Sequence, residues 1–191
     1  METTLYTIGH STHALAHVLT QLTQHGITAI ADVRSMPYSR RHPQFNREPF
    51  QDALAQHHIA YVHLGELGAR PTDPSCYAAG QVQYARLAAT TAFQHGLARL
   101  QDGMQRYRIA LLCAEKDPVT CHRTILICRA LRAPALAIQH ILADGRLEQH
   151  DASERRLVQL VDGTSVNRNQ DARIRLERAY DLQAQRIAYS K

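Results

Sequence analysis

The sequence predicts an α/β fold: one three-layer, Rossmann-like domain with a mostly parallel sheet, and further helices at the C-terminus. Short apolar segments alternate with longer segments whose apolar residues follow helical spacing. The segment IALLC (109–113) is apolar throughout, as is typical of a strand covered on both faces. The length of 191 residues suits one domain. We place the core at 1–150 and expect 151–191 to be a helical extension that packs on it.

The first half of the chain supplies three predicted strands and two predicted helices. They are, in order, a strand at 4–10, a helix at 12–26, a strand at 27–34, a helix at 47–58 and a strand at 59–65. Gly26 is the expected terminator of the first helix. The segment 66–80 contains two prolines and breaks the pattern, so we expect a long irregular loop there. Loops of that length in compact domains are often binding loops.

The second half continues the alternation and then changes character. We expect a helix at 84–104, a strand at 108–115, a helix at 121–132, a strand at 134–142 and a turn at 143–146. In 151–161, Ser153 is the expected helix cap, with Arg156 where glutamate would complete a capping box. The segment 168–191 is predicted to be a helix with the apolar stripe Ile174, Ala179, Leu182 and Ile187. It packs either on the body or on a second subunit, as in a homodimer, and the sequence leaves both open.

The charge is basic, and arginine dominates it. The formal net charge is +5, and 20 of the 22 basic residues are arginine. This composition favours an anionic partner such as a phosphate compound or nucleic acid, although arginine-rich codon usage explains it equally well. No segment reaches the roughly 18 apolar residues of a membrane span, and the N-terminus lacks a signal-peptide pattern. We therefore expect a cytoplasmic location, no membrane partner and four free cysteines.

Polar and reactive side chains follow the predicted strands. Because parallel α/β sheets bind ligands beyond the carboxyl ends of their strands, we expect these side chains to form one site. In order of the strands that they follow, they are Gly9, His10 and Ser11; Asp32, Val33, Arg34 and Ser35 with the turn MPYSRRHP (36–43), which includes Ser39; Gly65, Glu66 and Gly68; Cys113, Glu115, Cys121, His122 and Arg123; and His140 and Asp144.

The segment LLCAEKDPVTCHR (111–123) carries the densest chemistry. Either Asp117, followed by Pro118, or Thr120 caps the next helix, so Cys121 and His122 lie near its positive end, where a thiol pKa is lowered. Glu115 is the candidate general acid or base, together with Asp32 and assisted by His10 or His122. The predicted anion-binding residues are Arg34, Ser11, His122, Arg123 and Ser39.

Structural roles compete with these assignments. Cys113 and Cys128 are most simply small buried apolar residues, and Asp32 with Arg34 could form a structural ion pair. A metal site built from His10, Glu115, Cys121 and His122 is conceivable, but no ligand spacing supports it. We therefore assign no metal and no cofactor from the sequence.

The motifs taken together resemble a bacterial family catalogued as domain of unknown function 488. They are TIGHS (7–11), DVRSMPYS (32–39), LLCAEKDPVTCHR (111–123) and HI-ADG after it, so the resemblance covers roughly residues 4 to 190. It implies a compact α/β fold and no particular activity. Ala69 stands where the family usually has the second glycine of Leu-Gly-Gly. The family's signature positions match His10, Ser11, Asp32, Arg34, Pro37, Ser39, Cys113, Glu115, Cys121, His122 and Arg123.

The sequence supports three functional hypotheses, in this order. The first is an enzyme acting on a phosphate-bearing or nucleotide-like substrate by hydrolysis or group transfer, such as glycosidic cleavage by paired carboxylates. The second is a thiol-dependent enzyme with Cys121 as nucleophile and His122 or His10 as its partner. The third is a non-catalytic nucleic-acid-binding module that uses Arg34, Arg40, Arg41, Arg47 and the basic tail. With an aromatic content of 6%, stacking platforms for such a module are scarce.

Overall fold

The centre of the molecule is a six-stranded sheet with the order β3-β2-β6-β1-β7-β8. The computed structural model describes residues 3–163 and 171–191. Five strands are parallel, and β8 pairs antiparallel with β7. The strands are β1 (Thr3–Gly9), β2 (Ala29–Asp32), β3 (Ala60–His63), β6 (Ile109–Cys113), β7 (Leu136–Ile141) and β8 (Leu147–Gln149). The predicted α/β class with a mostly parallel sheet is confirmed. β8 was not predicted.

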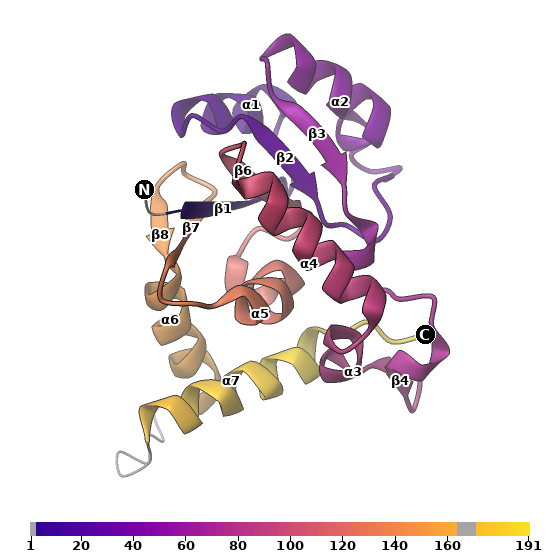
Figure 1. The fold of residues 1–191 in the computed structure, drawn as a ribbon, viewed down its shortest axis with the longest axis vertical. Coiled ribbons are helices and arrows are strands. Elements are labelled where there is room, and N and C mark those ends of the chain that lie inside the picture. Colours follow the sequence, from indigo (N-terminus) through magenta and orange to yellow (C-terminus); the bar gives the residue numbers. More distant parts are fainter. Residues whose placement is uncertain (1–2, 164–170) are drawn as a thin grey trace.

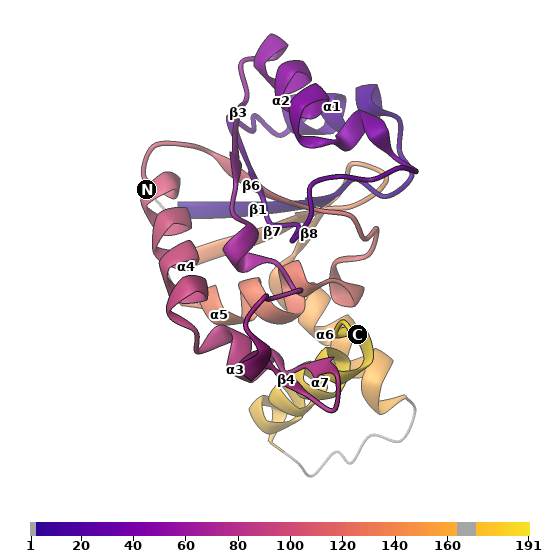
Figure 2. The same cartoon turned by 90° about the vertical axis from the view of Figure 1, so that its right-hand side faces the viewer.

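Helices cover both faces of this sheet and give the three layers. Figures 1 and 2 show one pair of helices on one face and a second group of helices on the other. The first pair is α1 (Leu15–Gln24) and α2 (Arg47–Gln56); the second group is α4 (Thr91–Met104), α5 (Arg129–Leu131), α6 (His150–Asp162) and α7 (Ala172–Ile187). Side chains alternate along the strands, so that Leu112 packs toward the first pair and Leu111 toward the second group. No helix in the described part of the chain is long and apolar enough to cross a membrane.

The carboxyl ends of β1 and β6 form the switch point of the sheet. The two strands are neighbours, but β1 continues into α1 on one face and β6 leads toward α5 on the other. Such a divergence leaves a crevice beyond the strand ends, where ligands bind in open α/β sheets. Two backbone hydrogen bonds hold the crevice together, from His10 N to Cys113 O and from Ser11 N to Ala114 O, both 2.9 Å.

Several predicted elements differ from the structure. The helix predicted at 84–104 is two helices, α3 (Tyr84–Ala88) and α4, because the Thr90 hydroxyl accepts a hydrogen bond from Phe93 N and starts a new helix. The segment 66–80 is also more regular than expected. It holds 3₁₀ turns at Gly65–Leu67 and Pro74–Cys76, and the strand β4 (Tyr77–Ala78) pairs with β5 (Gln81–Val82).

Two predictions about the C-terminal helices differ from the structure. α6 begins at His150, so Ser153 lies inside the helix and donates to Glu148 Oε2 instead of capping. α7 packs on the body through Ala179, Tyr180 and Gln183, whereas Ile174 from the predicted stripe is exposed. The start of the predicted tail helix, including Arg168, lies outside the described residues. The division of the chain at residue 150 stays a prediction.

Candidate functional site

A pocket of about 310 Å³ opens beyond the carboxyl ends of β1, β2 and β6. Five residues predicted as catalytic or anion-binding groups line this pocket: His10, Arg34, Ser39, Glu115 and His122. Cys113, which was predicted only as a signature position of the family, lines it too. A larger hollow of about 950 Å³ lies against β7, α6 and α7 and contains none of these groups. The strand-end pocket is therefore the candidate site.

Two thiols, a carboxylate and an imidazole meet in this region. They belong to Cys113 at the end of β6, Glu115 in the following loop, and Cys121 and His122 after a short 3₁₀ turn. Glu115 Oε2 lies 2.8 Å from Cys113 Sγ and 3.1 Å from Cys121 Sγ. His122 Nδ1 lies 3.4 Å from Cys113 Sγ and 3.9 Å from Cys121 Sγ. We call these four residues the Cys–Glu–His cluster. Both thiols and the imidazole are buried.

The two thiols of the cluster ionise very differently. Burial, reinforced by the hydrogen bond with Cys121, raises the pKa of Cys113 well above its usual value. Burial also opposes ionisation of Cys121. The hydrogen bond from Cys113 and the nearby charges of Arg123 and His122 outweigh it and hold the pKa of Cys121 well below its usual value. Of the two thiols, Cys121 is therefore the one that loses its proton more readily.

The other two members respond to the same pair of sulfurs. Burial, followed by the Cys121 thiolate, raises the pKa of Glu115. Burial alone would lower the pKa of His122, but its hydrogen bond with the Cys121 thiolate raises it. The other ring nitrogen, Nε2, donates to the carbonyl of Val33 at 3.0 Å, which fixes Nδ1 toward the sulfurs.

Arg34 is held at the pocket by a buried ion pair. Its guanidinium contacts the Asp32 carboxylate through Nε (2.9 Å) and Nη2 (2.6 Å), and Nη2 also donates to Phe45 O at 2.8 Å. The Tyr61 hydroxyl donates to the same carboxylate at 2.8 Å. Asp32 is fully buried. The structure does not bring it to the pocket surface, and its place is behind Arg34.

His10 completes the pocket wall beside Arg34. Its Nδ1 bonds the carbonyl of Ser11 at 2.9 Å, and its Nε2 lies 3.4 Å from Arg34 Nη1. Burial lowers the pKa of His10 to about 4, with the Arg34 charge adding to the effect. A neutral imidazole that donates through Nδ1 leaves Nε2 as an acceptor for the guanidinium.

Two predicted anion-binding residues are used elsewhere. Arg123 is fully buried, and its guanidinium donates to the carbonyls of Glu115 (2.7 Å) and Lys116 (3.2 Å) and to the Thr7 hydroxyl. It holds the loop that carries Glu115. Ser11 adopts a positive φ of 47° at the turn after β1 and does not line the pocket. Ser39 does line it, and its hydroxyl accepts from Arg41 N and His42 N.

The conformation of the loop at 68–70 shows why alanine is accepted at position 69, where the family usually has glycine. Gly68 approaches Ser35 so closely that a Cβ there would lie 2.7 Å from the Ser35 backbone. Ala69 is not among the described residues with positive φ, so alanine fits its backbone conformation. Arg70 N donates to Ser35 Oγ at 2.9 Å, which places this loop on the pocket wall.

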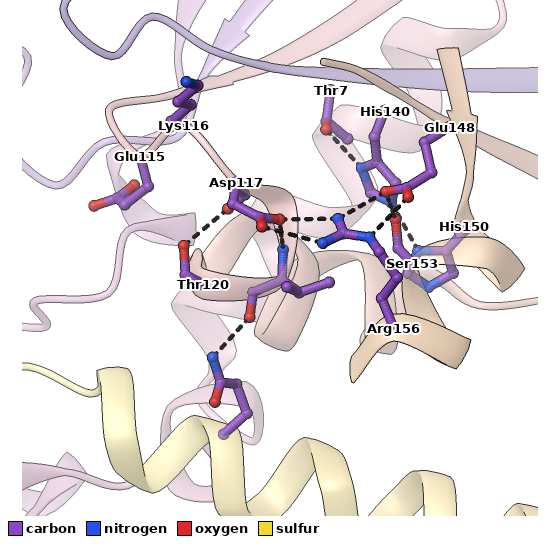
Figure 3. A network of polar contacts seen from close by, with 12 residues as sticks. Thr7, Glu115, Lys116, Asp117, Thr120, His140, Glu148, His150, Ser153 and Arg156 are labelled. Atoms are coloured by element: carbon purple, nitrogen blue, oxygen red, sulfur yellow. Dashed lines mark hydrogen bonds and ion pairs between the residues drawn. The ribbon is translucent and has the colours of Figure 1, made fainter. Parts of the chain in front are cut away.

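The local sequence positions Cys121 and His122 through a short capped turn. The Asp117 carboxylate accepts from Val119 N, and Pro118 occupies the first position of a 3₁₀ turn, Pro118–Thr120. Arg156 from α6 forms two hydrogen bonds to Asp117 (Figure 3). Gln183 from α7 donates to Val119 O. Cys121 is extended, and the helical segment after it runs as a π-helix over Arg123–Cys128 before α5. Asp117 with Pro118 thus forms a cap, as one of the two predicted alternatives had it, but it caps this separate turn and not the helix predicted at 121–132, whose helical segment begins only at Arg123.

Several pocket residues were given no role in the sequence analysis. They are Ser35, Met36, Tyr38, His42 and Arg70. The first four belong to the turn after β2, which the sequence already placed at the strand ends, although only Arg34 and Ser39 were assigned to the site from it. Arg70 belongs to a distant loop, and no local signal links it to the strand ends.

One of the three comparisons with known proteins gives a match. Neither the curated proteins nor the solved structures yielded a match. The family model for domain of unknown function DUF488 matches residues 14–130, which include the turn after β2, the 68–70 loop and the whole Cys–Glu–His cluster. The chain therefore belongs to the DUF488 family.

Proposed function

We propose that this protein is an enzyme that binds a small anionic substrate in the strand-end pocket and acts on it by hydrolysis or group transfer at the Cys–Glu–His cluster. The observation that carries the proposal is the joint lining of one pocket by Arg34 and by three members of that cluster, Cys113, Glu115 and His122. A binding group and reactive groups thus share one space.

Two guanidinium groups in the pocket can donate hydrogen bonds to an anion. Arg70 lines the pocket, and so does Arg34, whose Nη1 is the nitrogen that bonds neither Asp32 nor Phe45; Glu115 is the one carboxylate in the lining. Backbone and hydroxyl groups of the Ser35 and Ser39 turns add polar contacts. Guanidinium groups suit phosphate or carboxylate because they offer paired donors in one plane.

The size of the pocket and its rim favour a phosphate-bearing or nucleotide-like molecule. A volume of about 310 Å³ holds a small metabolite, or the anionic end of a larger one. Met36 and Tyr38 at the rim are exposed and offer an apolar surface for a sugar or base. Glu115 is the candidate general acid or base, since Asp32 is enclosed behind Arg34. Glycosidic cleavage by two pocket carboxylates is therefore the less favoured reaction.

Thermal-shift measurements with inorganic phosphate, sugar phosphates, nucleotides and neutral nucleosides test the proposal. A ligand at about 100 times its Kd adds roughly 2.7 kcal/mol, which raises the Tm by several degrees. We expect a shift with one phosphate-bearing class, reduced in Arg34→Lys and retained in the control Arg146→Lys, which lies at an exposed turn. An equal shift in both variants, or no shift with any anion, would refute the pocket assignment.

Turnover of the ligand identified in this way then tests the reactive groups. We expect Glu115→Gln to abolish turnover while binding persists, and the control Glu66→Gln to retain both, because Glu66 pairs with Arg99 on α4. Full activity in Glu115→Gln would contradict the assigned role of Glu115.

A thiol-dependent enzyme is the second candidate. The Arg123 backbone N–H lies 3.4 Å from Cys121 Sγ and favours a thiolate there. Cys121 is 1% exposed and does not line the pocket, so this candidate ranks second. Alkylation of the native protein at several pH values tests it. Modification of Cys121 with an apparent pKa well below ~8.5 supports it, and an inert thiol excludes it.

A further inference from the structure

We propose that the Cys–Glu–His cluster is a binding site for one zinc ion. The two Sγ atoms, a carboxylate oxygen of Glu115 and a ring nitrogen of His122 all lie within 4.8 Å of one another. From metal–ligand bond lengths of about 2.0–2.3 Å, neighbouring donors in a tetrahedral zinc site are roughly 3.3–3.8 Å apart. The separations from sulfur to oxygen and nitrogen here run from 2.8 to 3.9 Å, so a small contraction or expansion accommodates the ion.

The identity of the donors selects the metal. Thiolate and imidazole ligands together favour zinc over magnesium or calcium, which prefer oxygen donors. Two cysteines, one histidine and one carboxylate also make up the four ligands that a tetrahedral ion requires. The sequence had grouped His10 with Glu115, Cys121 and His122. In the structure Cys113 takes that place, because His10 faces Arg34 and the Ser11 carbonyl.

One carboxylate oxygen of Glu115 joins the two thiols of the cluster. It lies 2.8 Å from Cys113 Sγ and 3.1 Å from Cys121 Sγ, so three of the four donor atoms already converge in the metal-free chain. A divalent ion together with the buried guanidinium of Arg123 balances two thiolates and one carboxylate. The imidazole then stays neutral and binds through Nδ1.

Neighbouring groups orient the ligands as they do in metal sites. The Nε2–H of His122 donates to Val33 O, so that Nδ1 faces the sulfurs. The Arg123 backbone N–H donates to Cys121 Sγ, and its guanidinium fixes the carbonyl of Glu115. Figure 3 shows the Glu115 carboxylate directed away from the Asp117–Arg156 contacts, which hold the other end of the same loop.

The ion would lie at the inner wall of the strand-end pocket. Cys113, Glu115 and His122 line that pocket, and Glu115 is the most exposed of the four ligands. Its carboxylate is therefore the ligand that a substrate oxygen or a water molecule could replace. This last step rests on the proposed function, whereas zinc binding does not.

Metal analysis of the reduced, purified chain tests the site. After incubation with zinc and removal of free metal, we expect about one zinc ion per chain by mass spectrometry. Replacement by cobalt should give visible bands of a tetrahedral ion and a near-ultraviolet thiolate-to-cobalt band. A wild-type chain that takes up neither metal, or cobalt uptake without the thiolate band, would overturn the proposal. So would a Cys113–Cys121 disulfide in protein purified under reducing conditions.

Matched cysteine variants locate the site. We expect Cys113→Ser and Cys121→Ser to lose most of the zinc, and Cys76→Ser and Cys128→Ser to keep it, because those two buried thiols lie outside the cluster. Equal zinc content in all four variants would refute the ligand assignment. If a cluster variant does not fold, the cobalt spectrum of the Cys76→Ser/Cys128→Ser double variant still decides, since only Cys113 and Cys121 can then supply thiolates. Metal content and the ligand-induced Tm shift are separate readouts, so either proposal can fail alone.

Discussion

Arg34 is a pocket residue whose place depends on one carboxylate. Its side chain is 7% exposed, and that of Asp32 is fully buried. In Asp32→Asn the guanidinium loses its counter-charge inside the protein, and we expect a loss of about 3 kcal/mol in the free energy of unfolding. Urea denaturation measures this loss. The control Asp144→Asn breaks an exposed pair with Arg146 and should leave the midpoint unchanged. Wild-type stability in Asp32→Asn would show that the pair is not structural.

Gly9 allows the closest approach between β1 and the loop after β6. A Cβ at this position would lie 1.8 Å from the carbonyl oxygen of Glu115. Gly9→Ala must push the two apart, and we expect it to destabilise the fold by about 3 kcal/mol and to weaken metal retention. Gly103→Ala is the control, because Gly103 lies near the C-terminal end of α4 and its Cβ would meet only a flexible methyl group of Ile109, at 3.0 Å. If Gly9→Ala and Gly103→Ala had the same Tm, the close approach of Gly9 to the Glu115 carbonyl would not be required for stability.

The sequence predicted which residues meet at the strand ends better than it predicted their roles. Arg34, Glu115 and His122 line the pocket as expected. Asp32 and Arg123 lie next to it, but their charged groups face Arg34 and backbone carbonyls. A residue that directly follows a strand can be predicted to lie near the site. The sequence does not predict whether its charged group faces a ligand or another group of the protein, because that depends on side chains from distant elements.

At the scale of elements, the turn before Cys121 is tied to the C-terminal helices. Arg156 on α6 contacts both Asp117 and Glu148, and thus connects this turn to β8 (Figure 3). We expect Arg156→Met to speed hydrogen exchange at the backbone amides of Val119 and Thr120, since the cap at Asp117 loses its support. Unchanged exchange at these amides would mean that the turn is stable without the contact between Arg156 and Asp117.

The neighbouring residue provides the control for this prediction. Arg155 on the same helix is exposed, so Arg155→Met removes a similar side chain without touching the turn. We expect its exchange pattern at Val119 and Thr120 to match that of the wild type. A comparable effect in both variants would point to a general loosening of α6.

Elements were predicted well where apolar periodicity decides them and poorly where single contacts do. The strand at 109–113 lies within its predicted range. The break at Thr90, by contrast, depends on one hydroxyl that accepts from Phe93 N. The apolar pattern continues through it, so the sequence predicted one helix. In the same way, Ser153 is a residue type that often caps helices, but in the structure its hydroxyl donates a hydrogen bond to Glu148.

At the scale of the whole molecule, much of the arginine content is used internally. Arg129 and Arg132 pair with Glu177 on α7, and Arg156 pairs with Asp117 and Glu148. In the described part of the chain, these three arginines are therefore paired with carboxylates of the protein. These pairs favour a structural use of the arginines there over a nucleic-acid surface.

A buried chain of hydrogen bonds joins β1, β7, α6 and α7. The Thr7 hydroxyl bonds His140 Nδ1 (2.8 Å), His140 Nε2 bonds His150 Nδ1 (3.0 Å), and His150 Nε2 bonds the Tyr180 hydroxyl (3.1 Å). Tyr180 in turn donates to Glu154 at 2.9 Å. With both imidazoles neutral and protonated at Nε2, every bond has one donor and one acceptor. Figure 3 shows the first three of these residues in line.

The two histidines in this series of hydrogen bonds make the stability of the molecule depend on pH. Burial, with His150 and the charges of Arg123 and Arg156, holds the pKa of His140 well below 6.5. Burial also lowers the pKa of His150, with Arg132 in the same direction and Glu154 and Asp151 opposing. In each case the unfolded state binds the proton more readily, so this contribution is complete above pH 6.5 and is lost as the pH falls toward the folded pKa.

The loss should be measurable by urea denaturation. Between about pH 7 and about pH 5.5 we expect protonation of His140 and of His150 each to cost about 1 kcal/mol of unfolding free energy. His140→Gln removes one titrating group, so its stability, although lower at neutral pH, should fall less steeply over this range. The control is His57→Gln at the exposed end of α2, which should keep the wild-type slope. Equal slopes in wild type and His140→Gln would show that His140 is not held neutral, because a group with the same pKa in both states adds nothing to the pH dependence.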